Sequence, residues 1–176
     1  SFHIEREGQT IHLPTRRAES LLAYLTLHPE SHRREKLAAL LWGDSTDEQA
    51  RHSLRTALNM LRKHLGENLL LADREIIQID PSFPLWIDAN EFRRTMESGR
   101  QSADDVSASQ LQSSIDLYHG DLLLDFYDDW ILAERESLHE LYLDALIDLV
   151  QRLRAAAEYQ RAIDYAQQAL ASDPAN

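Results

Sequence analysis

The chain has 176 residues, of which 43% are hydrophobic and 27% are charged, and its formal net charge is −12. This length and composition fit one large or two small globular domains, and no run of 18 apolar residues predicts a membrane-spanning helix. The absence of cysteine excludes disulfide bonds, thiol nucleophiles and thiolate zinc sites. With no signal-peptide pattern at the amino terminus, we expect a cytoplasmic location.

The negative charge is concentrated in the second half of the sequence. Residues 1–88 contain 11 Lys and Arg against 13 Asp and Glu, whereas residues 89–176 contain 7 against 17. Between residues 31 and 65 the balance is reversed, with seven basic and four acidic side chains. Because the balance differs between the halves, we expect two domains with different partners.

A small β-hairpin and two helices are predicted at the start of the chain. Residues 2–5 and 10–13 alternate apolar and polar side chains, which favours two short strands joined by a turn. Thr15 is placed to cap a helix that runs to about residue 28. A second helix is expected over residues 33–42, because its leucines recur at helical spacing.

A third helix is predicted over residues 47–65, with Thr46 or Asp47 as its cap and Gly66 at its end. At about 100° per residue, one face of this helix is apolar and comprises Ala50, Leu54, Ala57, Leu58, Leu61 and Leu65. The opposite side, here called the basic face, spans about 80° and comprises Arg51, Arg55, Asn59 and Arg62. A charged outer face is common on the helices of globular proteins and does not by itself indicate DNA binding. The order of the surrounding elements therefore decides whether this face is interpreted as a DNA-contact surface.

Two short strands complete the first domain. Residues 69–72 and 76–79 are apolar runs joined by a turn with Arg74 at its centre. A hairpin, three helices and a second hairpin, in this order, are typical of a winged helix-turn-helix domain, which we assign to residues 1–87. In such a domain the third helix stays exposed and can enter a DNA major groove.

The side chains expected to contact DNA lie on the second and third helices and on the second hairpin. They are Arg33 and Arg34, then Arg51, His52, Arg55, Thr56, Asn59, Arg62 and Lys63, and finally Arg74. Arginines bind guanine edges or phosphates, and an asparagine pairs with adenine. His52 and Thr56 are placed to reach phosphate oxygens or a thymine methyl group. The DNA phosphate backbone is the expected contact of Arg62 and Lys63, and of Arg33 and Arg34. Arg74 is placed to enter a minor groove.

Residues 88–176 predict an all-helical domain. Asp88 and Glu91 have the spacing of a capping box, with Asp88 as the cap. Apart from a polar loop over residues 99–108, helices are expected at about 88–98, 109–118 and 128–157, and again towards Pro174.

The end of the chain has small residues at helical spacing, namely Ala162, Ala166 and Ala169, and is closed by Pro174. Small side chains allow two helices to approach closely, and the pattern resembles a tetratricopeptide repeat. Because the sequence stops where another repeat helix would begin, we expect the chain to be part of a longer protein.

The acidic side chains of this domain raise the alternative of a metal-dependent hydrolase. The candidates are His119 with Asp121, Asp128 with Asp129, and Glu140, Asp144 and Asp148. The last three lie opposite an apolar helical stripe, and the sequence contains no GxxxxGK[ST], GxSxG or HExxH motif. We therefore expect no catalysis, no metal and no cofactor, and we interpret Tyr127 and Trp130 as anchors between packed helices.

The two halves resemble, in order, the two domains of the SARP-type antibiotic regulatory proteins. The matching segments are LLW at 40–42, ARHSLRTALNMLRKHLG at 50–66, DANEF at 88–92, YHGDLL at 118–123, FYDDW at 126–130 and ER at 134–135. The resemblance implies an OmpR-type winged helix followed by a tetratricopeptide-like bacterial transcriptional activator domain. It also implies a regulator that binds double-stranded DNA, often as side-by-side copies on direct repeats, and that contacts RNA polymerase.

The sequence therefore predicts a mainly α fold, in which a winged helix-turn-helix domain with small β-hairpins precedes an all-α helical domain. The leading hypothesis is a transcriptional regulator, an activator, that reads the major groove with helix 47–65. Its helical domain would mediate homodimer or polymerase contact, with no role for a membrane. The alternative is a signalling adaptor that docks proteins without DNA. DNA binding would weaken steeply with salt and would require Arg55 and Arg62.

Overall fold

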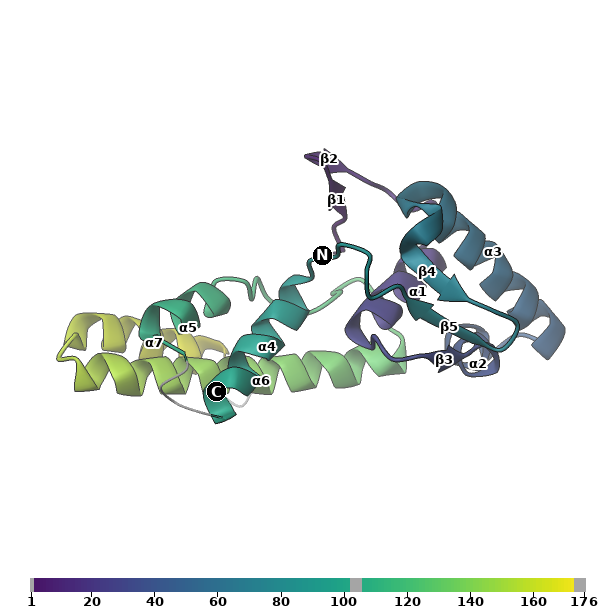
Figure 1. Cartoon of the computed structure of the whole chain (residues 1–176). Coiled ribbons are helices and arrows are strands. Elements are labelled where there is room, and N and C mark those ends of the chain that lie inside the picture. The colour runs from purple at the N-terminus through teal and green to yellow at the C-terminus, as the bar shows by residue number, and fades with distance from the viewer. Residues whose placement is uncertain (1, 102–105, 173–176) are drawn as a thin grey trace. The chain divides into compact units, whose positions relative to one another are not determined.

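The computed structural model describes residues 2–101 and 106–172, and the chain divides into two units, Ser1–Leu85 and Trp86–Asn176 (Figure 1). The first unit contains, in order, β1 (Glu5–Arg6), β2 (Gln9–Thr10), α1 (Arg16–Leu27), β3 (His32–Arg33), α2 (Arg34–Trp42), α3 (Asp47–Leu65), the 3₁₀ turn η1 (Glu67–Leu69), β4 (Leu70–Ala72) and β5 (Ile76–Ile79). Its small antiparallel sheets are β1–β2 and β3–β5–β4, with β5 in the centre. This arrangement of helices and sheets is consistent with a winged helix.

The helix boundaries of the first unit follow from their caps. The Thr15 hydroxyl accepts a bond from the backbone N–H of Ala18 at 3.2 Å, as expected of an N-cap. Thr46 caps α3 and forms a reciprocal capping box with Gln49. Gly66 ends the same helix at φ 121°, a backbone conformation that a residue with a Cβ rarely adopts.

The core of the first unit lies behind α3, against which α1 and α2 pack. The apolar face predicted for α3 is buried in full, with Leu54, Leu58 and Leu61 at most 1% exposed. Leu21 of α1 and Leu37 of α2 are fully buried too. Since burying one such leucine is worth about 1.5–3 kcal/mol, the apolar contacts fix which side of α3 faces outwards.

Two details of this unit differ from the sequence prediction. The first hairpin is shorter than expected, with its turn at Glu7 and Gly8, which both have positive φ as a two-residue turn requires. The strand β3 was not predicted, because two residues carry no detectable alternation. Arg33, expected at the start of the second helix, is the N-cap residue of α2 and at the same time pairs with Ile76 as part of β3.

The second unit is all-helical. It contains α4 (Asp88–Gln101), α5 (Ala108–Ile115), α6 (Asp129–Ala155) and α7 (Tyr159–Ser172). The helices share one core, whose most deeply buried members are Phe92, Leu111, Ile115, Ala145, Leu146, Leu149 and Leu153. In this unit α6 and α7 pack against each other as a helical hairpin, and Ala162 is buried between them, as its small side chain allows.

Three expectations for the second unit need correction. Asp88 is the first residue of α4 and not its cap, because the Ile87 carbonyl accepts the first helical bond, from Glu91. The helix α4 reaches Gln101, so it includes the start of the predicted loop 99–108, of which residues 102–105 lie outside the described chain, as does Pro174. Tyr127 is 81% exposed and anchors no helix, since the turn before α6 points it outwards.

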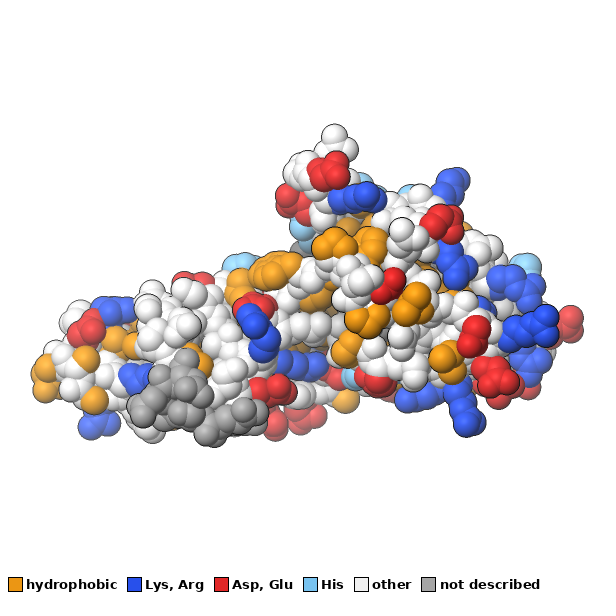
Figure 2. Space-filling model, in the orientation of Figure 1, with side chains coloured by type: hydrophobic (Ala, Val, Ile, Leu, Met, Phe, Trp, Pro, Cys, Tyr) orange, Lys and Arg blue, Asp and Glu red, His pale blue; other side chains and the backbone are white. Residues whose placement is uncertain are grey.

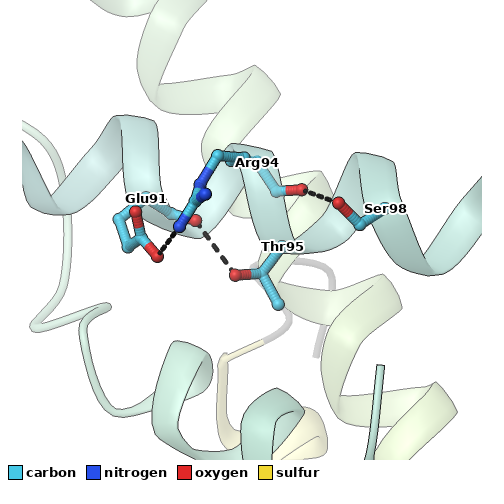
Figure 3. A network of polar contacts seen from close by, with 4 residues as sticks. All are labelled: Glu91, Arg94, Thr95 and Ser98. Carbon is cyan, nitrogen blue, oxygen red and sulfur yellow. Dashed lines mark hydrogen bonds and ion pairs between the residues drawn. The ribbon is translucent and has the colours of Figure 1, made fainter. Parts of the chain in front are cut away.

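Four polar side chains of α4 are held by contacts within the helix itself (Figure 3). The Arg94 guanidinium pairs with the Glu91 carboxylate at 2.5 Å, which raises the pKa of Arg94. The hydroxyls of Thr95 and Ser98 each donate to the carbonyl four residues earlier, at 3.1 and 2.9 Å. These polar groups are therefore satisfied locally and do not require another helix.

Candidate nucleic-acid interface

The basic face of α3 points away from the core. Arg51, Arg55 and Asn59 are exposed and Arg62 is half-buried, while the opposite face of the helix is closed. Lys and Arg side chains gather over the part of the unit that contains α2 and α3 (Figure 2). The tertiary structure thus leaves the predicted DNA-contact side chains of α3 accessible.

The side chains of the basic face have few partners. Within residues 2–101 and 106–172, Arg55, Asn59 and Arg62 make no side-chain hydrogen bond or ion pair. The Arg51 side chain is 59% exposed and lies 3.9 Å from the carboxylate of Glu35, whose side chain is 81% exposed. An exposed pair of this kind contributes at most about 1 kcal/mol, so Arg51 remains available to an outside ligand.

Three further candidates lie beside the basic face. His52, Thr56 and Lys63 are all exposed. The Thr56 hydroxyl donates to the carbonyl of His52 at 3.1 Å, so its proton is used inside the helix. Thr56 therefore offers its methyl group and its oxygen lone pairs to a ligand, and it suits a thymine methyl better than a phosphate.

Arg34, the first residue of α2, joins this helix to the turn between β4 and β5. Its backbone N–H donates to the Glu75 carbonyl at 2.8 Å, and its Nε donates to the Asp73 carbonyl at 2.7 Å. Burial lowers the pKa of Arg34, and the positive charges of Arg62 and Arg55 lower it further. A like charge nearby disfavours the protonated form of Arg34.

The turn between β4 and β5 is organised by its first residue. The Asp73 carboxylate accepts bonds from the backbone N–H groups of Glu75 and Ile76, at 2.7 and 2.8 Å. These two bonds lower the pKa of Asp73 below its ordinary range. Arg74 follows at the tip and is exposed, and so is Arg33 in the adjoining strand β3.

Sequence reasoning missed two residues that support this surface. Asp73 was seen only as a turn residue, although an aspartate at the start of a tight turn commonly accepts bonds from the backbone N–H groups that follow it. Arg6 of β1 donates to the Leu65 carbonyl at the end of α3, 3.2 Å away. No local sequence pattern predicts the contact between Arg6 and Leu65, because the two residues are 59 positions apart.

In the second unit, the hydrolase candidates named from the sequence all lie among the described residues. Among the described residues, no group of three or more His, Cys, Asp or Glu is arranged to hold a metal ion. Of the hydrolase candidates, Asp148 is paired with Arg152 at 3.0 Å, while His119 and Glu140 are exposed. In the same described part of the chain, no helix is long and apolar enough to cross a membrane.

Comparison with known proteins concerns mainly the second unit. The family model described as "Bacterial transcriptional activator domain" matches residues 87–176, about half of the chain. No curated protein matches the sequence significantly. Members of the matched family are transcription regulators and not enzymes. With its four helices around one core and this match over their full length, the chain belongs to the bacterial transcriptional activator domain family.

Proposed function

We propose that the chain is a sequence-specific DNA-binding activator of transcription, of the SARP type, whose helix α3 inserts into a major groove. The observation that carries this proposal is the division of α3 into a buried apolar face and an exposed basic face. The donors of Arg55, Asn59 and Arg62 have no partner in the described residues, and base edges and phosphates supply the missing acceptors. A regulator that reads bacterial chromosomal DNA acts in the cytoplasm.

The position of each side chain along α3 supports a division of roles. Arg51, Arg55 and Asn59 lie in its first three and a half turns and are assigned to base edges, which bidentate donors discriminate. Arg62 and Lys63 lie in the last turn and are assigned to phosphates, together with His52. Phosphate contacts set the position of the protein on the duplex, and base contacts set the sequence that it prefers.

The β4–β5 hairpin and the start of α2 add contacts on either side of the helix. Arg74 is exposed at the tip of the turn, as a side chain that enters a minor groove must be. Arg33 and Arg34 are assigned to phosphates at the edge of the major groove. Both are tied to the hairpin, Arg33 through strand pairing and Arg34 through the Asp73 carbonyl.

The second unit is proposed to bind proteins, either a second copy of the chain on a direct repeat or RNA polymerase. Its helix α7 exposes large apolar side chains, with Tyr159 at 64%, Ile163 at 50% and Leu170 at 60%. These recur at helical spacing on one side of α7, and exposed apolar patches are typical of protein-contact surfaces. The strongly acidic composition of this half is unsuited to DNA.

A selection of genomic DNA fragments by the purified chain, read by sequencing, tests the proposal. The wild-type chain should enrich fragments with a shared motif, and the affinity should fall steeply with salt. The double variant Arg55→Ala, Arg62→Ala should lose this enrichment. The matched control Arg94→Ala, Arg161→Ala removes the same charge from the second unit and should retain it.

Two outcomes would overturn the proposal. One is a wild-type chain that enriches no fragment at low salt. The other is a double variant that binds DNA as well as the control does. In either case the signalling adaptor becomes the better description, since its activity would reside in protein contacts that the α3 variant leaves intact.

A further inference from the structure

The turn of the β4–β5 hairpin and the start of α2 are joined by two hydrogen bonds that Arg34 donates. The backbone N–H of Arg34 donates to Glu75, and its guanidinium Nε donates to the carbonyl of Asp73. The Asp73 carboxylate at the same time closes the turn by accepting from two backbone N–H groups. One aspartate therefore shapes the turn and holds the arginine.

The held arginine lies beside the basic face of α3. Glu35, the next residue of α2, lies 3.9 Å from Arg51, so the start of α2 adjoins this face. The positive charges of Arg62 and Arg55 also lower the pKa of Arg34, as this position requires. A guanidinium held there by a neutral carbonyl keeps its positive charge, which a phosphate group matches.

We propose that Asp73 is a positioning residue for DNA binding: its carboxylate closes the turn, and the turn's Asp73 carbonyl holds Arg34 beside the basic face of α3, so that Arg34 binds a backbone phosphate. The inference rests on the proposed function, because its ligand is the DNA that α3 reads. Arg34 uses Nε for the Asp73 carbonyl, and its two terminal amino groups remain for the phosphate oxygens.

A positioning role and a purely electrostatic role predict opposite effects of removing the Asp73 carboxylate. If Asp73 acted only as a negative charge near DNA, both Asp73→Ala and Asp73→Asn would bind DNA more tightly than wild type. As a positioning residue, it must be replaced by a side chain that still accepts the two turn bonds. Asparagine retains an acceptor oxygen at that position and alanine does not.

The experiment measures affinity for a short duplex that carries the motif enriched by the wild-type chain. Asp73→Ala keeps the backbone carbonyl but loses the carboxylate that orients it. It should weaken binding by up to about tenfold, the size expected when a hydrogen bond to a charged group is lost, whereas Asp73→Asn should bind as well as wild type or better. Arg34→Lys retains the charge but loses Nε, and it should weaken binding to a similar extent. Because Asp73→Ala acts through the Arg34 contact, the double variant Asp73→Ala, Arg34→Lys should be no weaker than Arg34→Lys.

A second readout separates positioning from general damage to the fold. Ethylation of individual phosphates should interfere with wild-type binding at several phosphates, and Arg34→Lys identifies the one that Arg34 contacts. Interference at that phosphate should vanish in Asp73→Ala and persist in Asp73→Asn, while protection of guanine N7 by α3 persists in both. Equal melting temperatures would show that each variant is folded.

The outcomes distinguish the inference from the function on which it rests. A wild-type chain that binds no duplex overturns both. Wild-type binding combined with tighter binding of Asp73→Ala, with additive effects in the double variant, or with unchanged phosphate interference overturns the role of Asp73 and leaves the activator proposal standing.

Discussion

The guanidinium of Arg6 in β1 donates a hydrogen bond to the carbonyl of Leu65, the last residue of α3, across 3.2 Å. The last carbonyls of a helix lack partners within the helix and carry the negative end of its dipole. Arg6 therefore serves as a cationic cap, and it ties the first hairpin to the helix that carries the basic face.

Removing this cap should destabilise the first unit without touching the basic face. We expect Arg6→Ala to lower the free energy of unfolding by about 1 kcal/mol, the size of a typical helix-terminus interaction. Chemical denaturation measures the change. The control is Arg74→Ala, which removes an exposed arginine of the same unit and should leave stability unaltered. Equal stabilities of the two variants would contradict a capping role for Arg6.

Asn59 and Arg62 should differ in how they affect DNA selection. Asn59→Ala removes a side chain assigned to an adenine, and it should relax the preference at one base pair by about 1–3 kcal/mol. Arg62→Ala removes a phosphate contact, so it should weaken all sequences alike and reduce the salt slope by about 1. Binding to a panel of single-base operator variants at several salt concentrations measures both effects. If Asn59→Ala instead weakened all sequences alike and Arg62→Ala relaxed the preference at one base pair, the assignment of Asn59 to a base and of Arg62 to a phosphate would be wrong.

The second unit offers a matched pair of core and surface substitutions on α6. Leu149 is 0% exposed, whereas Ile147, two residues earlier, is 52% exposed. We expect Leu149→Ala to destabilise the second unit by about 2–5 kcal/mol, because it leaves a cavity in a packed core. Ile147→Ala should change stability by less than about 0.5 kcal/mol. Thermal unfolding followed by circular dichroism compares them, and a similar loss in both would mean that Ile147 is covered in solution.

The pH dependence of the β4–β5 turn follows from Asp73. Its pKa in the folded chain lies below the ordinary value of 3.8, because backbone N–H groups bind the ionised carboxylate. The stability that this group contributes is thus complete above 3.8 and is lost as the pH falls through the lower folded value. The amide NMR signals of Glu75 and Ile76 should shift in that acidic window, and Asp73→Asn should abolish the shift. A titration centred at or above the ordinary value would contradict the turn bonds.

Much of the first unit was predictable because its strongest signals are local. A helix repeats every 3.6 residues, so the apolar and basic faces of α3 can be assigned from spacing alone. The caps at Thr15 and Thr46 depend on residues within three positions, and both were confirmed. The all-helical character of the second unit, with a long α6, was confirmed for the same reason.

Tertiary structure decided the features that join distant segments. The strand β3 has two residues and exists because β5 pairs with it, which no window of neighbouring residues can indicate. For the same reason, sequence alone proposed Arg34 as a phosphate contact but did not show that Asp73, 39 positions away, holds its guanidinium. Local periodicity determined which side chains share a face. Contacts between segments far apart in the chain decided how the surface is assembled, because hydrogen bonds join α2 to the β4–β5 hairpin and apolar packing joins α2 to α3.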